Sequence, residues 1–174
     1  MRHAMWLALL VSIVPAAALA QDTPKADVFG GYSLTRSEDT NLHGFEASLA
    51  LNLGGSFGVV VDLSGHFATV DGIDVSRTFF LAGPRLARRG DDLTIYGQVL
   101  VGGVRTSAGV EVLGVNISEQ STDLAGTVGG GVDFRVAGNW GVRLQGELAV
   151  IRGDGKTSTE PRASLGIVYR AGKR

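Results

Sequence analysis

Apolar and polar residues alternate with a period of two along most of this chain. In the clearest stretch, residues 44–53, every second residue is apolar: Phe45, Ala47, Leu49, Leu51 and Leu53. The positions between them hold small or polar residues, among them Glu46 and Ser48. Because successive side chains of a β-strand point to opposite faces, this pattern predicts strands with one apolar and one polar face.

The same pattern predicts eight strands, at residues 26–36, 43–53, 57–68, 76–88, 93–106, 122–136, 140–152 and 161–170. Short connections, at residues 54–56, 89–92 and 137–139, alternate with four longer polar ones, at residues 37–42, 69–75, 107–121 and 153–160. Pro84 has no backbone N–H to donate, so we expect it near a strand end or a bulge.

Residues 1–20 have the pattern of a secretory signal peptide. A positive start at Arg2 is followed by an apolar run from Ala4 to Val14 and a small-residue end at Ala18-Leu19-Ala20. This predicts cleavage after Ala20 and a mature domain of residues 21–174. An uncleaved anchor is the alternative, which the helix-breaking Pro15 disfavours. No later run is long enough for a membrane-spanning helix, so a mature chain in a membrane would cross it as strands.

The composition limits the chemistry of the chain. Hydrophobic residues make up 44% of the sequence, too many for a disordered chain. There is no cysteine, which excludes disulfides and thiolate metal sites. The net charge is −1, or −2 once Arg2 is removed, and so small a charge does not recruit nucleic acid.

A closed barrel and a soluble sandwich share this alternation, and three features favour the barrel. Two are the signal peptide and the alternation of short and long connections, which is typical of barrels with short periplasmic turns. The third is a set of aromatic residues at both ends of the strands, as lipid interfaces select: Phe57, Phe134, Trp140 and Tyr169 beside the short turns, and Phe45, Phe67 and Phe80 toward the long connections. The sequence therefore predicts an all-β fold, an eight-stranded antiparallel up-and-down transmembrane β-barrel in the outer membrane.

The polar face of the predicted strands carries charges of both signs. They are Glu46, Asp62, Asp133, Arg143, Glu147 and Arg162, with Arg85 and Arg135 as further candidates. An eight-stranded barrel is just wide enough for side chains to fill it, and buried charges of opposite sign must pair. We therefore expect a plugged lumen and a structural or surface-interaction role. A narrow channel for small solutes is the alternative.

The longest connection has a pattern of its own. Apolar residues lie on both sides of Gly114: Val110, Val112, Leu113, Val115 and Ile117. Alternation around a glycine predicts a hairpin that continues strands five and six beyond the membrane. Its open edge would be a template for another strand, and so a docking site for another surface protein or a polymer. The alternative is that the hairpin packs over the barrel mouth.

One group of residues resembles a catalytic set: Asp62, Ser64 and His66. Outer-membrane lipid hydrolases use serine and histidine on barrel strands, but those groups face lipid, whereas these are predicted to face the lumen. Side chains on one face of a strand also stand roughly 6.5–7 Å apart, too far for a base to contact a nucleophile directly. We therefore expect no enzyme activity. We also expect no cofactor and no metal, because residues 153–157 lack the first glycine of a phosphate-binding loop and Asp71 and Asp74 are too few ligands for calcium.

Five segments resemble the small OmpA/OmpX-type outer-membrane barrels of the porin family: residues 28–34 (VFGGYSL), 99–104 (VLVGGV), 129–134 (GGGVDF), 143–145 (RLQ) and 162–170 (RASLGIVYR). The resemblance implies contact with outer-membrane lipid and lipopolysaccharide. It also implies that the barrel-assembly machinery reads the last strand, with Tyr169 as the aromatic residue recognised there. Chains of that family usually end on this aromatic, whereas residues 171–174 follow it here.

Overall fold

The computed structural model describes residues 24–37, 40–70, 73–112, 115–153 and 156–173. For residues 70, 73, 108–112, 115–120 and 173 it describes the backbone alone. The predicted signal peptide, residues 1–20, lies outside the described residues, so its cleavage after Ala20 stays a prediction.

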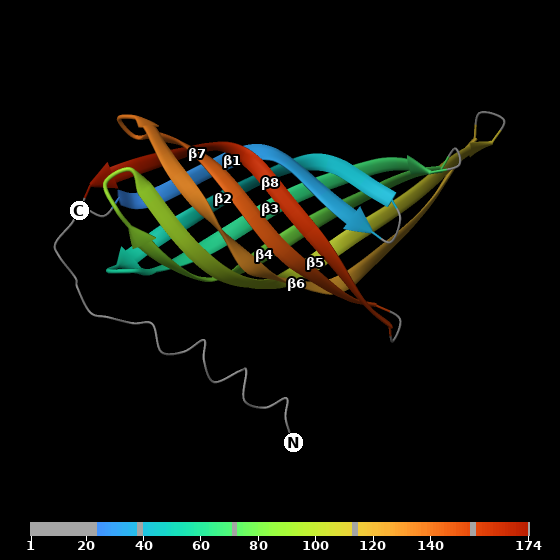
Figure 1. Ribbon diagram of the computed structural model, residues 1–174. Helices are drawn as coiled ribbons and strands as arrows, with labels where there is room; N and C mark the ends of the chain where they lie inside the picture. Colours follow the sequence, from blue (N-terminus) through green and yellow to red (C-terminus); the bar gives the residue numbers. More distant parts are fainter. Residues whose placement is uncertain (1–23, 38–39, 71–72, 113–114, 154–155, 174) are drawn as a thin grey trace, which may run out of the picture.

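The described residues form eight strands that close into a barrel (Figure 1). The strands are β1 Pro24–Ser37, β2 Thr40–Gly54, β3 Phe57–Val70, β4 Ile73–Arg89, β5 Leu93–Val112, β6 Val115–Ala137, β7 Trp140–Gly153 and β8 Lys156–Lys173. Each strand pairs antiparallel with the next, and β1 pairs with β8 from Pro24–Lys173 to Thr35–Arg162. This confirms the predicted up-and-down barrel. The described residues contain no helix that could span a membrane.

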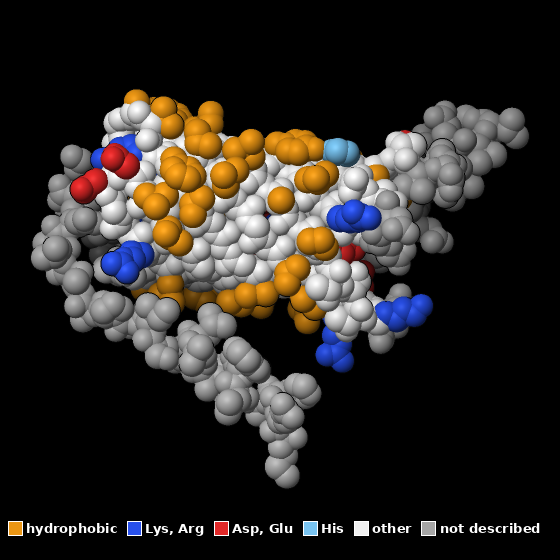
Figure 2. All heavy atoms as spheres, viewed as in Figure 1, with side chains coloured by type: hydrophobic (Ala, Val, Ile, Leu, Met, Phe, Trp, Pro, Cys, Tyr) orange, Lys and Arg blue, Asp and Glu red, His pale blue; other side chains and the backbone are white. Residues whose placement is uncertain are grey.

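Side chains alternate along the strands between the lumen and the outer face. On β2, Glu46, Ser48, Ala50 and Asn52 are buried, whereas the residues between them are exposed. Figure 2 shows the outward apolar side chains as a broad band, with most charged side chains of the visible face at the two ends of the barrel. A surface of this kind suits a hydrocarbon environment, in which the closed sheet also satisfies the backbone N–H and C=O groups of its strands.

The aromatic residues predicted for the two interfaces all point outward. Those beside the short turns are 36–54% exposed: Phe57, Phe134, Trp140 and Tyr169. Those at the other end, Phe45, Phe67 and Phe80, are 47–55% exposed, and Tyr32 joins them. The predicted outward orientation of these rings is therefore confirmed, and their place at the lipid interfaces stays a prediction.

Three tight turns and both ends of the described chain lie at one end of the barrel, here called the turn end (Figure 1). Gly55 and Gly138 have φ angles of 56° and 54°, in the left-handed region that glycine adopts without strain. These turns also bond to neighbouring strands: the Arg135 N–H donates to Asp92 O at 2.8 Å and the Arg170 N–H to Asn139 O at 2.9 Å. The short connections were therefore predicted correctly.

The connections at the opposite end, here called the hairpin end, are shorter than the sequence predicted. Only residues 38–39, 71–72, 113–114 and 154–155 separate the strands there. The long polar loops predicted at residues 37–42, 69–75 and 153–160 are therefore wrong, because strands run through most of each segment. Within residues 107–121 the pairing of β5 with β6 continues to Val112–Val115, as the predicted hairpin requires. Strand pairing at this end continues to Ser37–Thr40, Val70–Ile73, Val112–Val115 and Gly153–Lys156.

Pro84 lies inside β4, not near its end, so that prediction was also wrong. The pairing of β4 with β5 passes from Ala82–Val101 to Arg85–Gln98 and omits Gly83 and Pro84. On the other side Pro84 pairs with Val59 of β3, and its ring is exposed on the outer face. The missing N–H thus interrupts one ladder locally without ending the strand.

The two longest strands, β5 and β6, form a hairpin that projects beyond the rest of the barrel (Figure 1). Their ladder continues to Val112–Val115. The pairing of β6 with β7 begins only at Leu124–Arg152, and that of β5 with β4 starts at Gly109–Asp74. Within the described residues, one edge of β6 from Val115 to Asp123 therefore has no partner strand.

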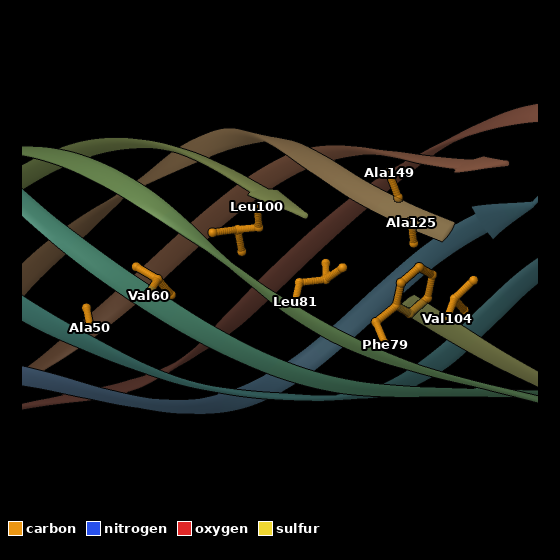
Figure 3. Close-up of a cluster of buried hydrophobic side chains, with 8 residues drawn as sticks. All are labelled: Ala50, Val60, Phe79, Leu81, Leu100, Val104, Ala125 and Ala149. Atoms are coloured by element: carbon orange, nitrogen blue, oxygen red, sulfur yellow. The ribbon is translucent and has the colours of Figure 1, made fainter. Parts of the chain in front are cut away.

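An apolar cluster lines one side of the lumen (Figure 3). Most of its members come from β3 to β6, and all are at most 3% exposed: Ala50, Val60, Phe79, Leu81, Leu100, Val104, Ala125 and Ala149. The adjacent residues Phe79 and Phe80 point to opposite faces: Phe79 is 1% exposed inside the lumen, whereas Phe80 is 55% exposed on the outer face. Apolar side chains consequently fill the lumen on this side.

Packing inside the barrel predicts the effect of one glycine substitution. Gly44 faces the lumen, and a Cβ there would overlap the backbone carbonyl of Gly65. We expect G44A to lower the free energy of unfolding by about 1–3 kcal/mol, the usual cost of overpacking. Urea titration of the barrel refolded in lipid vesicles measures this value.

The matched control is G146A. Gly146 points outward on β7, and a Cβ there would meet nothing within 4 Å. Its stability should be unchanged or slightly raised. Equal losses in the two variants would contradict the packing described here.

Candidate functional site: the barrel lumen

Among the described residues, ten charged side chains are buried inside the barrel, including all six of the predicted set. Glu46, Asp62, Asp133, Arg143, Glu147 and Arg162 are each at most 5% exposed. They lie on β2, β3, β6, β7 and β8, at the strand positions that point inward. Arg85 also lies inside, whereas Arg135 is exposed near a turn, where β6 and β7 shift register. The inclusion of Arg135 was therefore wrong.

Arg162 of β8 is the centre of the first group of charges, here called the Arg162 cluster. Its guanidinium donates to Glu147 Oε2 on β7, with Nε at 3.0 Å and Nη2 closer still. It also reaches across the lumen to β3, where Nη1 donates to Ser64 Oγ at 2.7 Å and Nη2 to Asp62 Oδ1 at 3.5 Å. Its Nε lies 3.9 Å from Glu46 Oε2. One cation therefore holds three carboxylates together.

Hydrogen bonds extend the Arg162 cluster toward both ends. Glu46 accepts bonds of 2.6 Å from Ser164 Oγ and from Gln145 Nε2. Ser164 is also bonded to Ser33 at 3.0 Å, and Ser33 to His66 Nε2 at 2.9 Å. This hydrogen-bond network thus involves β1, β2, β3, β7 and β8, opposite much of the apolar cluster.

A second group of charges, the Arg143 cluster, lies nearer the turn end. Arg143 donates two bonds to Asp133, from Nε at 2.7 Å and Nη2 at 2.9 Å. The Arg85 guanidinium stacks on the Tyr96 ring, 3.6 Å from its centroid, and Nη2 lies 3.8 Å from Asp133 Oδ2. Tyr96 donates its hydroxyl to Gln145 Oε1, which connects the two clusters.

Ion pairs also occupy both mouths of the lumen. At the turn end Arg89 lies 3.7 Å from Asp27 and donates to Asn52 Oδ1 at 2.6 Å. At the hairpin end Arg77 donates to both oxygens of Glu160, at 2.6 and 2.8 Å. The charges are therefore paired at several levels along the barrel.

The lumen charges balance overall but not locally. In the part of the chain that the structure describes, six carboxylates are buried, namely Asp27, Glu46, Asp62, Asp133, Glu147 and Glu160. Six arginines face them, of which Arg85, Arg143, Arg162 and Arg170 are buried and Arg77 and Arg89 have side chains 21% and 12% exposed. The Arg162 cluster has three acidic side chains around one arginine. The turn-end half has four arginines and two carboxylates, an excess of two positive charges.

Several of these residues were missed from the sequence. Asp27, Gln98, Gln145, Glu160 and Arg170 all bond or pair inside the lumen or lie buried there. Their spacing could have identified them, because residues an even number of positions apart on a strand point to the same face. Arg170, for example, lies eight positions from Arg162 along β8 and so shares its face.

The structure places Asp62, Ser64 and His66 in the lumen, each at most 1% exposed. Ser64 accepts its bond from Arg162, and His66 is bonded to Ser33. Each member of this group, which resembles a catalytic set in the sequence, therefore has a partner outside it. Among the described residues, no group of three or more histidine or acidic side chains could hold a metal ion.

The predicted hairpin residues fall on the paired tips of β5 and β6. Val110 pairs with Ile117, and Val112 with Val115. Leu113 lies outside the described residues. The hairpin itself is thus present, and its role as a docking site stays a prediction.

A closed eight-stranded antiparallel sheet, apolar outside and ion-paired inside, defines the class of transmembrane outer-membrane β-barrels. A family model described as the outer membrane protein beta-barrel domain matches residues 6–170. The chain belongs to this family and is an integral outer-membrane protein. No curated protein matches it by sequence.

Solved structures of similar fold are small outer-membrane barrels. Ail, the attachment invasion locus protein of Yersinia pestis, is 19% identical, with a TM-score of 0.60 over 84% of this chain and 98% of Ail. Neisserial surface protein A is 14% identical, with a TM-score of 0.58 over 83% and 95%. The N-terminal barrel of Pseudomonas aeruginosa OprF is 16% identical, with a TM-score of 0.52 over 86% and 98%. At such identities the likeness establishes the fold alone.

The Arg162 cluster predicts a large loss of stability in R162Q. Removal of the cation would leave three buried carboxylates close together, and breaking a buried ion pair commonly costs about 3–5 kcal/mol. We expect the free energy of unfolding in urea to fall by about that amount. The exposed Arg135 is the control, and R135Q should change the value by less than about 0.5 kcal/mol. Equal unfolding midpoints would show that the cluster does not stabilise the barrel.

Proposed function

We propose that this barrel is closed to solutes and serves as a structural or surface-interaction protein, with the β5–β6 hairpin as its docking element. The observation that carries the first part is the bridge made by Arg162 across the lumen, from β8 to Glu147 of β7 and to Asp62 and Ser64 of β3. The unpaired edge of β6 carries the second part.

The case for a closed lumen rests on successive barriers along the barrel. A solute entering from the hairpin end meets the Arg77–Glu160 pair, then Phe79, whose ring lies 5.8 Å from the Arg162 guanidinium. From the turn end it meets the Arg89–Asp27 pair and then the Arg143 cluster. Opening a path would separate buried charges, and each separated pair costs several kcal/mol.

Planar-bilayer recording tests this proposal. We expect the wild-type barrel to show no large, stable channel, because its charged groups are paired across the lumen. E147Q weakens the hold on Arg162 and should increase the frequency of openings. G146A, which changes only the outer face, is the control. A steady wild-type conductance that changes on substitution of Arg143 or Glu147 would favour the alternative, a narrow channel for small solutes.

The hairpin is the element best placed to meet a partner. An unpaired strand edge standing in water offers N–H and C=O groups that a second strand can pair with. If the short turns face the periplasm, as in other barrels of this class, the hairpin faces the outside. Ail, which has a similar fold, has been crystallised with the heparin analogue sucrose octasulfate, so a sulfated polymer is a second partner to test.

A variant without the hairpin tip tests the docking role. Gly109 and Ser118 face each other in the ladder, so residues 110–117 can be replaced by Asn-Gly, which forms a two-residue hairpin turn. The barrel should still refold and keep its heat-shifted gel band, because the tip lies outside the closed part. Adhesion of cells expressing it, or capture of a partner, should be lost.

The opposite result would show that the hairpin tip is a lid over the barrel mouth. If the shortened barrel unfolds at lower urea concentration and wild-type cells show no adhesion, the tip stabilises the mouth and the docking proposal fails. An exposed charge elsewhere at this end provides the control: K156Q should leave both adhesion and stability unchanged.

The other proposed partners are those of the outer membrane itself. We propose that the aromatic belts and the apolar band contact lipid, and that a lipopolysaccharide headgroup packs at a hollow of about 670 Å³ lined in part by His43, Phe67 and Asp74. Tyr169, 36% exposed near the turn end of β8, is the residue we propose that the barrel-assembly machinery reads. We propose no enzyme activity, because Asp62, Ser64 and His66 are each at most 1% exposed and open to neither lipid nor solvent.

A further inference from the structure

Arg85 of β4 is a buried cation whose hydrogen-bonding capacity is unused. It is 1% exposed, and none of its three guanidinium nitrogens has a hydrogen-bond partner among the described residues. A guanidinium has five N–H donors and cannot be deprotonated to avoid the cost of burial. Leaving such donors unsatisfied is expensive, so this group calls for an acceptor.

The neighbouring carboxylates do not provide that acceptor. Asp133 lies 3.8 Å from Arg85 Nη2, and both its oxygens already accept bonds from Arg143. Asp27 interacts with Arg89 and Asn52 instead. The Arg85 guanidinium also lies over the Tyr96 ring, 3.6 Å from its centroid, a contact that leaves its N–H donors without a hydrogen-bond acceptor.

The local charge identifies the kind of acceptor. Four arginines in this half of the lumen, Arg85, Arg89, Arg143 and Arg170, face the two carboxylates of Asp27 and Asp133. Among the described residues, two positive charges of this half are therefore uncompensated where the surroundings are poorly solvated. A neutral water molecule would satisfy the N–H donors but not the charge, whereas an anion would satisfy both.

We propose that the turn-end half of the lumen binds a small monovalent inorganic anion, chloride in the cell, on the unused N–H groups of Arg85. The anion must be small, because the Arg89–Asn52 and Arg170–Thr94 hydrogen bonds occupy the mouth through which it enters. A multiply charged oxyanion is disfavoured by the nearby Asp27 carboxylate, which has one unbonded oxygen. The site is independent of docking at the hairpin and exists whether or not the lumen conducts.

The test compares sodium chloride with sodium gluconate at equal ionic strength, using the barrel refolded in detergent micelles. Gluconate is too large for the site. Chloride should raise the urea midpoint of unfolding in a saturable way, and the 35Cl resonance should be broadened beyond its width with empty micelles. In R85Q both effects should disappear. R88Q is the matched control, because Arg88 lies on the same strand but points outward, and both effects should persist.

Equal midpoints in chloride and gluconate, with no excess 35Cl broadening in the wild type, would overturn the proposal and leave water as the partner of Arg85. If R85Q does not refold, wild-type crystals grown in bromide test the site instead. An anomalous peak within hydrogen-bond distance of the Arg85 guanidinium supports the site, and its absence there refutes it.

Discussion

Closure of the sheet between β1 and β8 is the constraint on which the rest of this structure depends. Inside a bilayer no water is available for unpaired N–H and C=O groups, so an open sheet edge is not tolerated there. The β1–β8 ladder, from Pro24–Lys173 to Thr35–Arg162, removes that edge. With eight strands the resulting cylinder is narrow, so side chains that point inward must pack against one another.

The narrow interior explains why the lumen is organised into two sides. Apolar side chains, mainly of β3 to β6, fill one side without any need for partners. On the other side, polar residues contact one another across the lumen. Arg162, for example, donates a hydrogen bond of 2.7 Å to Ser64, which lies about a hundred positions earlier in the sequence. Phe79 lies between the two sides, with its ring edge-on to His66 at 5.9 Å. The charges are thus separated from lipid by the wall and from water by their neighbours.

The sequence predicted the strands and the face on which each side chain lies, because both follow from the alternation of apolar and polar residues. The six lumen charges were predicted from the same alternation. It failed where the outcome depends on the closed sheet. The segments at residues 37–42 and 153–160 are polar, and polarity alone does not tell a loop from a strand standing in water. The bond from Arg77 to Glu160 and the bridge from Arg162 to Asp62 join strands that are not sequence neighbours, so their partners are set by register around the whole barrel. Arg135 shares the inward parity of Asp133, but the register shift next to the turn exposes it.

The position of Arg162 and Ser164 on the last strand has a consequence for folding kinetics. The β1–β8 ladder joins the two ends of the chain, Asp27 with Arg170 for example, and contacts of such long sequence separation form late because they close the largest loop. Until β8 docks, Glu46 and Glu147 lack the cation and hydroxyl that they bond to in the finished barrel. Those carboxylates therefore remain hydrated while the sheet is open, and desolvation of the lumen coincides with closure. Dehydration of the charges and completion of the barrel are then one cooperative step, which resists the accumulation of half-closed barrels in the membrane.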